Sequence, residues 1–118
     1  TSRRTPPDVE ALIASYPFDY TLLFSRDTFN PIPAFVTLCE RLFVTADSTG
    51  MISEAVTHGT ASVEVLMTLK NTASKFGRFL QNLEKEGAVH FFDGTLGDAA
   101  RKVDLTPAFE RARTMLKL

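Results

Sequence analysis

Residues 72–107 read TASKFGRFLQNLEKEGAVHFFDGTLGDAARKVDLTP, and this stretch decides the fold expected for the chain. It begins with an amphipathic helix over 73–86, because its apolar residues repeat at helical spacing and form one stripe: Phe76, Phe79, Leu80 and Leu83. Thr72 stands where an N-cap is expected, and Gly87 stands where a helix commonly ends in a left-handed residue. The stretch therefore opens with a well-delimited helix that has one apolar and one polar face.

The residues after this helix predict a two-stranded hairpin. A strand over 88–92 leads into Asp93-Gly94, a strong turn signal, and a return strand covers 101–105. Helix, strand, turn and strand in this order are typical of the winged helix-turn-helix. The expected fold is mainly α with a small β-hairpin wing (α+β), with a recognition helix at 73–86 and a wing at 93–100.

The rest of the chain predicts one domain with further helices. Residues 1–7 contain two prolines and no large apolar side chain, which indicates a flexible tail. Residues 8–118 are expected to form a single winged-helix domain, whose three parts are N-terminal helices (8–46), a helix-turn-helix core with its wing (49–105) and a C-terminal helix (106–118). Apolar spacing within the first two parts predicts helices over 8–16, 34–46, 49–58 and 63–69.

Composition excludes several classes of protein. The chain has 118 residues, net charge −1 and one cysteine, so no disulfide can form within it, which suits a cytoplasmic location. It has no apolar run of the roughly 18 residues that a membrane span needs. No catalytic motif is present, and the two histidines, His58 and His90, are too isolated to suggest a metal site. A non-enzymatic domain without cofactor, metal or membrane is expected.

Charge is distributed unevenly along the chain. Residues 1–69 carry 4 basic and 8 acidic side chains, whereas residues 70–118 carry 9 basic and 6 acidic ones. The positive half contains the expected recognition helix, which favours contact with the phosphates of a nucleic acid. A solvated face on a chain of ordinary charge is the alternative interpretation.

Seven residues are candidates for contact with DNA. Lys75, Arg78 and Asn82 lie on the exposed face of the expected helix, where recognition helices reach base edges. The other four are two hydroxyl side chains that suit phosphate and two cations of the return strand: Thr72, Ser74, Arg101 and Lys102. Thr72 also serves as an N-cap in either interpretation, and a charged edge strand explains the last two cations equally well.

This stretch resembles the second half of MarR-type winged-helix transcriptional regulators. The resemblance rests on a motif of three parts: Leu80, Leu83-Glu84, Glu86-Gly87 and Val89; then Gly97-Asp98 and Arg101-Lys102-Val103; then Leu105-Thr106-Pro107. It implies a helix in the major groove, a wing on the flanking backbone and a final helix at a dimer interface. Gly77 departs from the pattern, because glycine inside a helix costs about 1 kcal/mol relative to alanine.

Two functions follow from these observations. The first is a sequence-specific regulator that binds double-stranded DNA as a homodimer, since pairing two recognition helices lengthens the site. The resemblance adds a small aromatic effector, bound between the N-terminal helices and the winged domain. The alternative is a winged-helix module for protein–protein contact that does not bind DNA.

Overall fold

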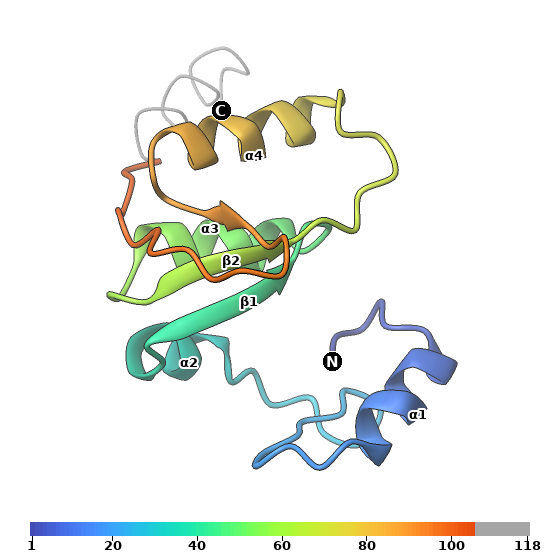
Figure 1. Cartoon of the computed structure of the whole chain (residues 1–118). Coiled ribbons are helices and arrows are strands. Elements are labelled where there is room, and N and C mark those ends of the chain that lie inside the picture. The colour runs from blue at the N-terminus through green and yellow to red at the C-terminus, as the bar shows by residue number, and fades with distance from the viewer. Residues whose placement is uncertain (106–118) are drawn as a thin grey trace, which may run out of the picture. The chain divides into compact units, whose positions relative to one another are not determined.

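The computed structural model describes residues 1–105, and the chain divides into two compact units, Thr1–Pro31 and Ile32–Leu118 (Figure 1). In the first unit, helix α1 (Pro7–Ser15) has proline at its first position, where the missing N–H is not needed. Residues 16–31 continue as turns and irregular backbone. The helix expected over 8–16 is therefore confirmed.

The second unit alternates strands and helices. Its elements are α2 (Ile32–Leu38), β1 (Arg41–Thr45), α3 (Thr49–Thr57), β2 (Ser62–Leu66), α4 (Lys75–Lys85) and β3 (His90–Phe91). The strands form one parallel sheet in the order β1-β2-β3, in which Arg41 is paired with Ser62 and Glu64 with His90. The described part of this unit is thus a small α/β domain.

Both helices that connect the strands pack on the same face of the sheet. Crossovers between parallel strands are right-handed, and each crossover here moves one strand further in the same direction. The core reflects this arrangement, because side chains of both helices join the same side of β2: Ile52 and Val56 of α3, Leu80 and Leu83 of α4, and Val63 and Val65 of β2. Because side chains alternate along a strand, the opposite face of β2 belongs to a different surface.

The expected winged helix-turn-helix is wrong. The Asp93-Gly94 turn does form, with Gly94 at φ 95° and Thr95 bonded to Asp93, but it does not lead into a hairpin. After the turn the chain runs back beside β2, where the Val63 N–H donates to the Ala99 carbonyl at 2.9 Å. Residues 101–105 form no strand, and β3 is paired in parallel with β2 instead.

Strands form in two segments where helices were expected. The helix expected over 34–46 ends as α2 at Leu38, and β1 begins three residues later; the helix expected over 63–69 is replaced by β2. Both strand sequences, RLFVT and SVEVL, are rich in β-branched or aromatic residues, which fit a pleated surface. Pairing within the sheet therefore outweighs the apolar spacing that suggested helices.

The remaining helices lie close to their expected positions. α3 confirms the helix expected over 49–58, and α4 confirms the one expected over 73–86, although its N-cap is Ser74 and not Thr72. The Ser74 hydroxyl accepts a hydrogen bond from the Gly77 N–H at 3.1 Å. The expected C-terminal helix, 106–118, lies outside the described residues.

Candidate functional site

The face of the sheet opposite α3 and α4 carries a mixture of charged and aromatic side chains. We call it the open face, and it consists of Arg41, Phe43, Thr45, Glu64, Leu66, His90 and, just after β3, Phe92. The strand register places these residues on one side, because Phe43 is paired with Glu64 and Glu64 with His90. Two parts of this surface differ in chemistry, a polar cluster around Glu64 and an aromatic pair beside it.

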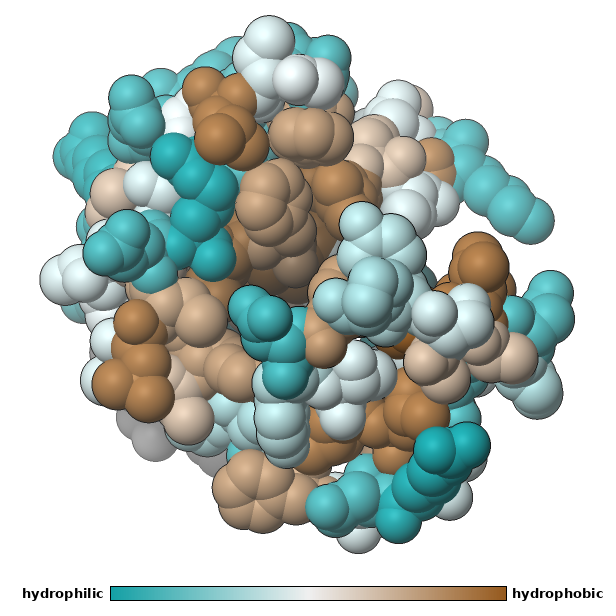
Figure 2. All heavy atoms as spheres, turned by 60° about the horizontal axis from the view of Figure 1, so that its bottom comes forward, coloured by the Kyte–Doolittle hydropathy of each residue, from teal (hydrophilic) through white to brown (hydrophobic). Residues whose placement is uncertain are grey.

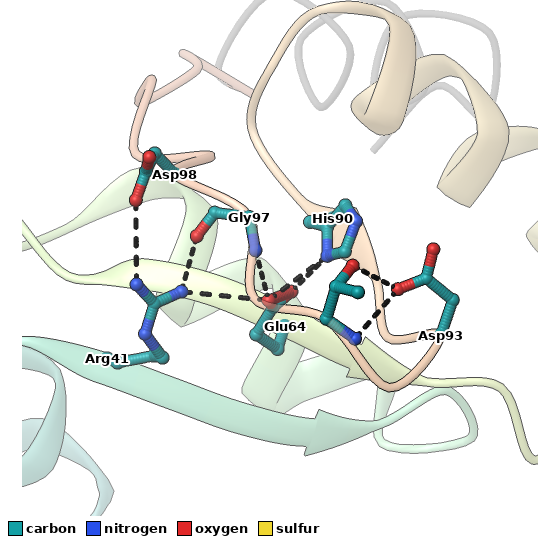
Figure 3. Close-up of polar contacts among 7 residues, drawn as sticks. Arg41, Glu64, His90, Asp93, Gly97 and Asp98 are labelled. Carbon is teal, nitrogen blue, oxygen red and sulfur yellow. Dashed lines mark hydrogen bonds and ion pairs between the residues drawn. The ribbon is translucent and has the colours of Figure 1, made fainter.

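Glu64 is the centre of the polar cluster (Figure 3). Its side chain is 0% exposed, and its carboxylate accepts hydrogen bonds from His90 Nδ1 at 2.6 Å and from the Gly97 N–H at 2.7 Å. Arg41 lies 3.6 Å from the same carboxylate, and its guanidinium also contacts Asp98 and the Gly97 carbonyl. A buried charge is tolerated only when it is paired in this way.

These contacts fix the loop over 93–98 on the sheet. A Cβ built on Gly97 would lie 2.5 Å from His90 Cγ, so the loop backbone rests against the imidazole ring without room for a side chain. At the other end of the loop, the Thr95 N–H and hydroxyl both donate to Asp93. The loop thus covers Glu64 and His90 on the open face.

The cluster orients a histidine through the Glu64 carboxylate. A carboxylate can only accept, so His90 Nδ1 carries a proton and donates it to Glu64. No hydroxyl or thiol is bonded to His90 in the part of the chain that the structure describes. Within residues 1–105, no three His, Cys, Asp or Glu side chains come together as a metal site. What the described contacts of the cluster do is hold the loop over 93–98 against β2 and β3.

The stability of the Asp93 turn is expected to depend on pH. The Thr95 hydroxyl and N–H hold the pKa of the exposed Asp93 carboxyl below its ordinary value, because both bond its charged form. The stabilisation is present above the unfolded pKa and is lost as pH falls through the folded one. We expect Thr95→Val to raise the Asp93 pKa in a carbon-detected NMR titration, whereas Thr68→Val leaves it unchanged. An unshifted Asp93 in Thr95→Val contradicts the hydroxyl bond.

The aromatic part of the open face is formed by Phe43 and Phe92. Their ring centroids are 5.5 Å apart in an edge-to-face arrangement, yet their exposed fractions are 51% and 39%. Leu96, on the loop over 93–98, is also exposed. Large apolar side chains reach solvent on both units, and Figure 2 shows hydrophobic residues among hydrophilic ones on the surface it presents. On the open face they gather next to the polar cluster.

The structure places the candidate DNA-contact residues on α4, just before it, and in the segment after the loop over 93–98. Lys75, Arg78 and Asn82 are exposed on α4, with Thr72 and Ser74 just before it. Arg101 lies near the C-terminal end of α4, with its N–H bonded to the Gly87 carbonyl. Lys102 points inward, where its Nζ donates to the carbonyls of Ala55 and Ala61 at 2.7 and 2.8 Å, and burial lowers the pKa of this amine.

Sequence reasoning missed Arg41, Glu64, His90 and Gly97. One signal was available, since Glu64 stands between two valines in a strand that reads SVEVL. A carboxylate inside an apolar run needs a buried partner of opposite charge or a hydrogen-bond donor, and Arg41 and His90 are residues of those kinds. The approach of Gly97 depends on the path of the loop and has no such signal.

A cavity of about 340 Å³ lies within the first unit. Its lining includes two cations and one carboxylate: Arg3, Arg26 and Glu10. All of its lining residues fall between 2 and 26, so it is not the pocket expected between N-terminal helices and a winged domain. None of the helices in residues 1–105 is long and apolar enough to cross a bilayer.

Comparison with known proteins contradicts the expected membership of the MarR-type regulators. The model of a family described as mitochondrial fission ELM1 matches residues 1–118, the whole chain. No curated protein and no solved structure matches the chain. The assignments to MarR-type regulators, to transcriptional regulation and to double-stranded DNA as a partner are therefore wrong. The homodimer expected from pairing two recognition helices loses its basis with them.

Proposed function

The chain belongs to the mitochondrial fission ELM1 family, and from this premise we propose that it is a protein-interaction domain whose partner docks on the open face. We propose that it acts in mitochondrial fission, the process that the family's description names, by binding a partner and not by catalysing a reaction. We place this role in the cytoplasm, which suits a chain with one cysteine. The observation that carries the proposal is the half-exposed pair Phe43 and Phe92 on a parallel sheet.

Parallel sheets rarely leave a face in water. Their crossovers normally place helices on both sides, so both faces of the strands become buried. In residues 32–105 both crossover helices lie on one face, and on the other face the loop over 93–98 covers Glu64 and His90. Aromatic side chains that remain exposed beside such a cover mark a surface suited to a protein partner.

An α-helix is the partner element that fits this surface best. The loop over 93–98 covers Glu64 and His90, so the surface left beside it carries Phe43 and Phe92, a narrow apolar patch that one stripe of a helix can cover. Side chains of the open face stand away from the sheet, so the contact is made through the face of the sheet and not through the outer edge of β1. A partner helix would thus complete the layer that parallel sheets usually have.

The test uses the full chain and a neutral amphipathic peptide, stapled as a helix with one leucine stripe. NMR titration is expected to shift the signals of Phe43, Leu66 and Phe92. We expect Phe43→Ser to weaken binding by about thirtyfold, the effect typical of a central aromatic residue in an interface. The matched control is Phe29→Ser, which removes an exposed phenylalanine from the first unit and leaves binding unchanged.

Two outcomes would overturn the proposal. One is the absence of any shift at millimolar peptide. The other is an equal loss of affinity in Phe43→Ser and Phe29→Ser, which would show that the peptide adheres to exposed aromatic residues in general. Thermal unfolding of each variant, followed by circular dichroism, verifies that both remain folded.

A further inference from the structure

We infer that the cavity within the first unit binds a phosphorylated polyol, such as a sugar phosphate, through Arg3 and Arg26. This inference goes beyond the proposed function, because it concerns residues 2–26 and not the open face. Its basis is the way the cavity is built, the charged side chains that line it and its volume.

Three segments of the first unit enclose the cavity, and Glu10 joins them. Glu10 lies on α1, and its carboxylate accepts hydrogen bonds from the Thr1 hydroxyl at 2.6 Å and from the Ser25 hydroxyl. The Thr1 hydroxyl in turn accepts from the Phe24 N–H at 2.9 Å. The N-terminal segment, α1 and the segment around residue 24 are therefore held together by hydrogen bonds within the unit.

Two arginines line the cavity from two of these segments. Arg3 belongs to the N-terminal segment, and Arg26 belongs to a turn in which its N–H donates to the Leu23 carbonyl at 2.9 Å. Within residues 1–105, neither guanidinium forms an ion pair or a side-chain hydrogen bond. Glu10 is the one carboxylate of the lining, so the lining retains one positive charge.

The other charged side chains of the first unit lie outside the lining. They are one cation and three carboxylates: Arg4, Asp8, Asp19 and Asp27. The side chains of the whole unit are thus slightly acidic, with three arginines against four carboxylates. An anion therefore finds a positive surrounding at the cavity and not on the unit in general.

A pair of guanidinium groups suits a phosphate ester better than a carboxylate. Each guanidinium can donate two parallel N–H bonds to one anionic group. A carboxylate has two oxygens, which one arginine satisfies, whereas a terminal phosphate has three oxygens and up to two negative charges. A phosphate ester therefore makes use of both Arg3 and Arg26.

The rest of the cavity suits a carbon skeleton with hydroxyl groups. Its volume of about 340 Å³ lies at the lower end of the range for small-molecule sites, so it holds more than a phosphate ion alone. Leu23 and Phe24 supply apolar surface for the carbon atoms. The Ser25 and Thr1 hydroxyls hold the pKa of the Glu10 carboxyl below its ordinary value. Glu10 therefore remains a carboxylate at neutral pH, which accepts from hydroxyl groups and repels a second anionic group.

The experiment titrates the full chain with four probes: glucose-6-phosphate, inorganic phosphate, gluconate and glucose. Binding is followed by NMR at the backbone amides and at the Nε–H groups of the arginines. We expect glucose-6-phosphate to shift the signals of Arg3 and Arg26. It should bind more tightly than each other probe by about tenfold, the effect of one hydrogen bond to a charged group. This affinity should fall as salt rises.

Variants locate the site. Arg3→Gln and Arg26→Gln are each expected to weaken binding of glucose-6-phosphate by about tenfold, because each removes charged hydrogen-bond donors. Arg4→Gln is the matched control, since Arg4 is the exposed neighbour of Arg3 and does not line the cavity. It should leave the affinity unchanged. The NMR spectrum of each variant without probe verifies that the first unit remains folded.

Four results would overturn the inference. If no probe shifts Arg3 or Arg26 at millimolar concentration, the cavity is not a site for this class of ligand. If inorganic phosphate binds as tightly as glucose-6-phosphate, the cavity takes an adventitious ion only, and if gluconate does so, phosphate is not selected. If Arg4→Gln acts as strongly as Arg3→Gln, the attraction is to exposed arginines in general. None of these results bears on helix docking at the open face, which the peptide titration tests separately.

Discussion

Replacing Gly77 by alanine is expected to lower the free energy of unfolding by about 3 kcal/mol or more, the upper range for overpacking. A Cβ at this position in α4 would lie 2.1 Å from the Thr72 carbonyl oxygen and 2.9 Å from Thr72 Cα. Backbone atoms cannot rotate aside as a side chain can, so the segment before the helix must move. That movement would also disturb the Ser74 cap bonded to Gly77. Urea denaturation measures the loss.

Gly50→Ala is the matched control. Gly50 also lies in the first turn of a helix, α3, but a Cβ there meets no atom within 4 Å. Alanine should stabilise this helix by about 0.5–1 kcal/mol, because it restricts the unfolded chain. If Gly77→Ala stabilised the chain as Gly50→Ala does, Thr72 could not pass so close to α4.

Glu64→Ala is the second substitution with a large expected effect, a loss of about 3 kcal/mol, at the lower end of the range for a broken buried ion pair. The lower end applies because Arg41 and His90 are about one-quarter exposed and water can partly replace the carboxylate. The Gly97 N–H also loses its acceptor. In Glu64→Ala, hydrogen exchange of the Gly97 amide and of the other amides of the loop over 93–98 should become faster.

Glu64→Gln separates charge from shape. It keeps the volume and one oxygen that can accept from Gly97, so we expect a smaller loss of about 1–2 kcal/mol, close to that of a charged hydrogen bond. Chemical unfolding and amide exchange are measured on both variants. Equal stability of Glu64→Ala and the unmodified chain would show that the loop is held by other contacts.

Helices with their own end signals could be predicted from the sequence. α3 and α4 combine apolar spacing with glycines that end them or follow shortly after, and Gly59 and Gly87 indeed adopt positive φ. Short apolar runs were ambiguous, since the residues of β1 and β2 satisfy helical spacing locally. Their pairing depends on residues far away in the sequence, such as Arg41 with Ser62, which no local pattern reveals. The position of the Asp93-Gly94 turn was predicted correctly, but the path of the chain after the turn was not. That path depends on the hydrogen bond from the Gly97 N–H to the Glu64 carboxylate, which the sequence does not reveal.

Parallel pairing also affects the order in which this chain can fold. Glu64 and His90 can pair only after the chain between them, which includes α4 and its two flanking loops, has folded back. In the same way, β1 can pair with β2 only after the chain through α3 has folded back. Closing such long segments costs chain entropy before any sheet contact is gained. Topologies of this kind fold more slowly than those built from neighbouring contacts. Phe43 of β1 is thus made before its partners exist, and a nascent chain exposes it until β2 and then Phe92 have been synthesised.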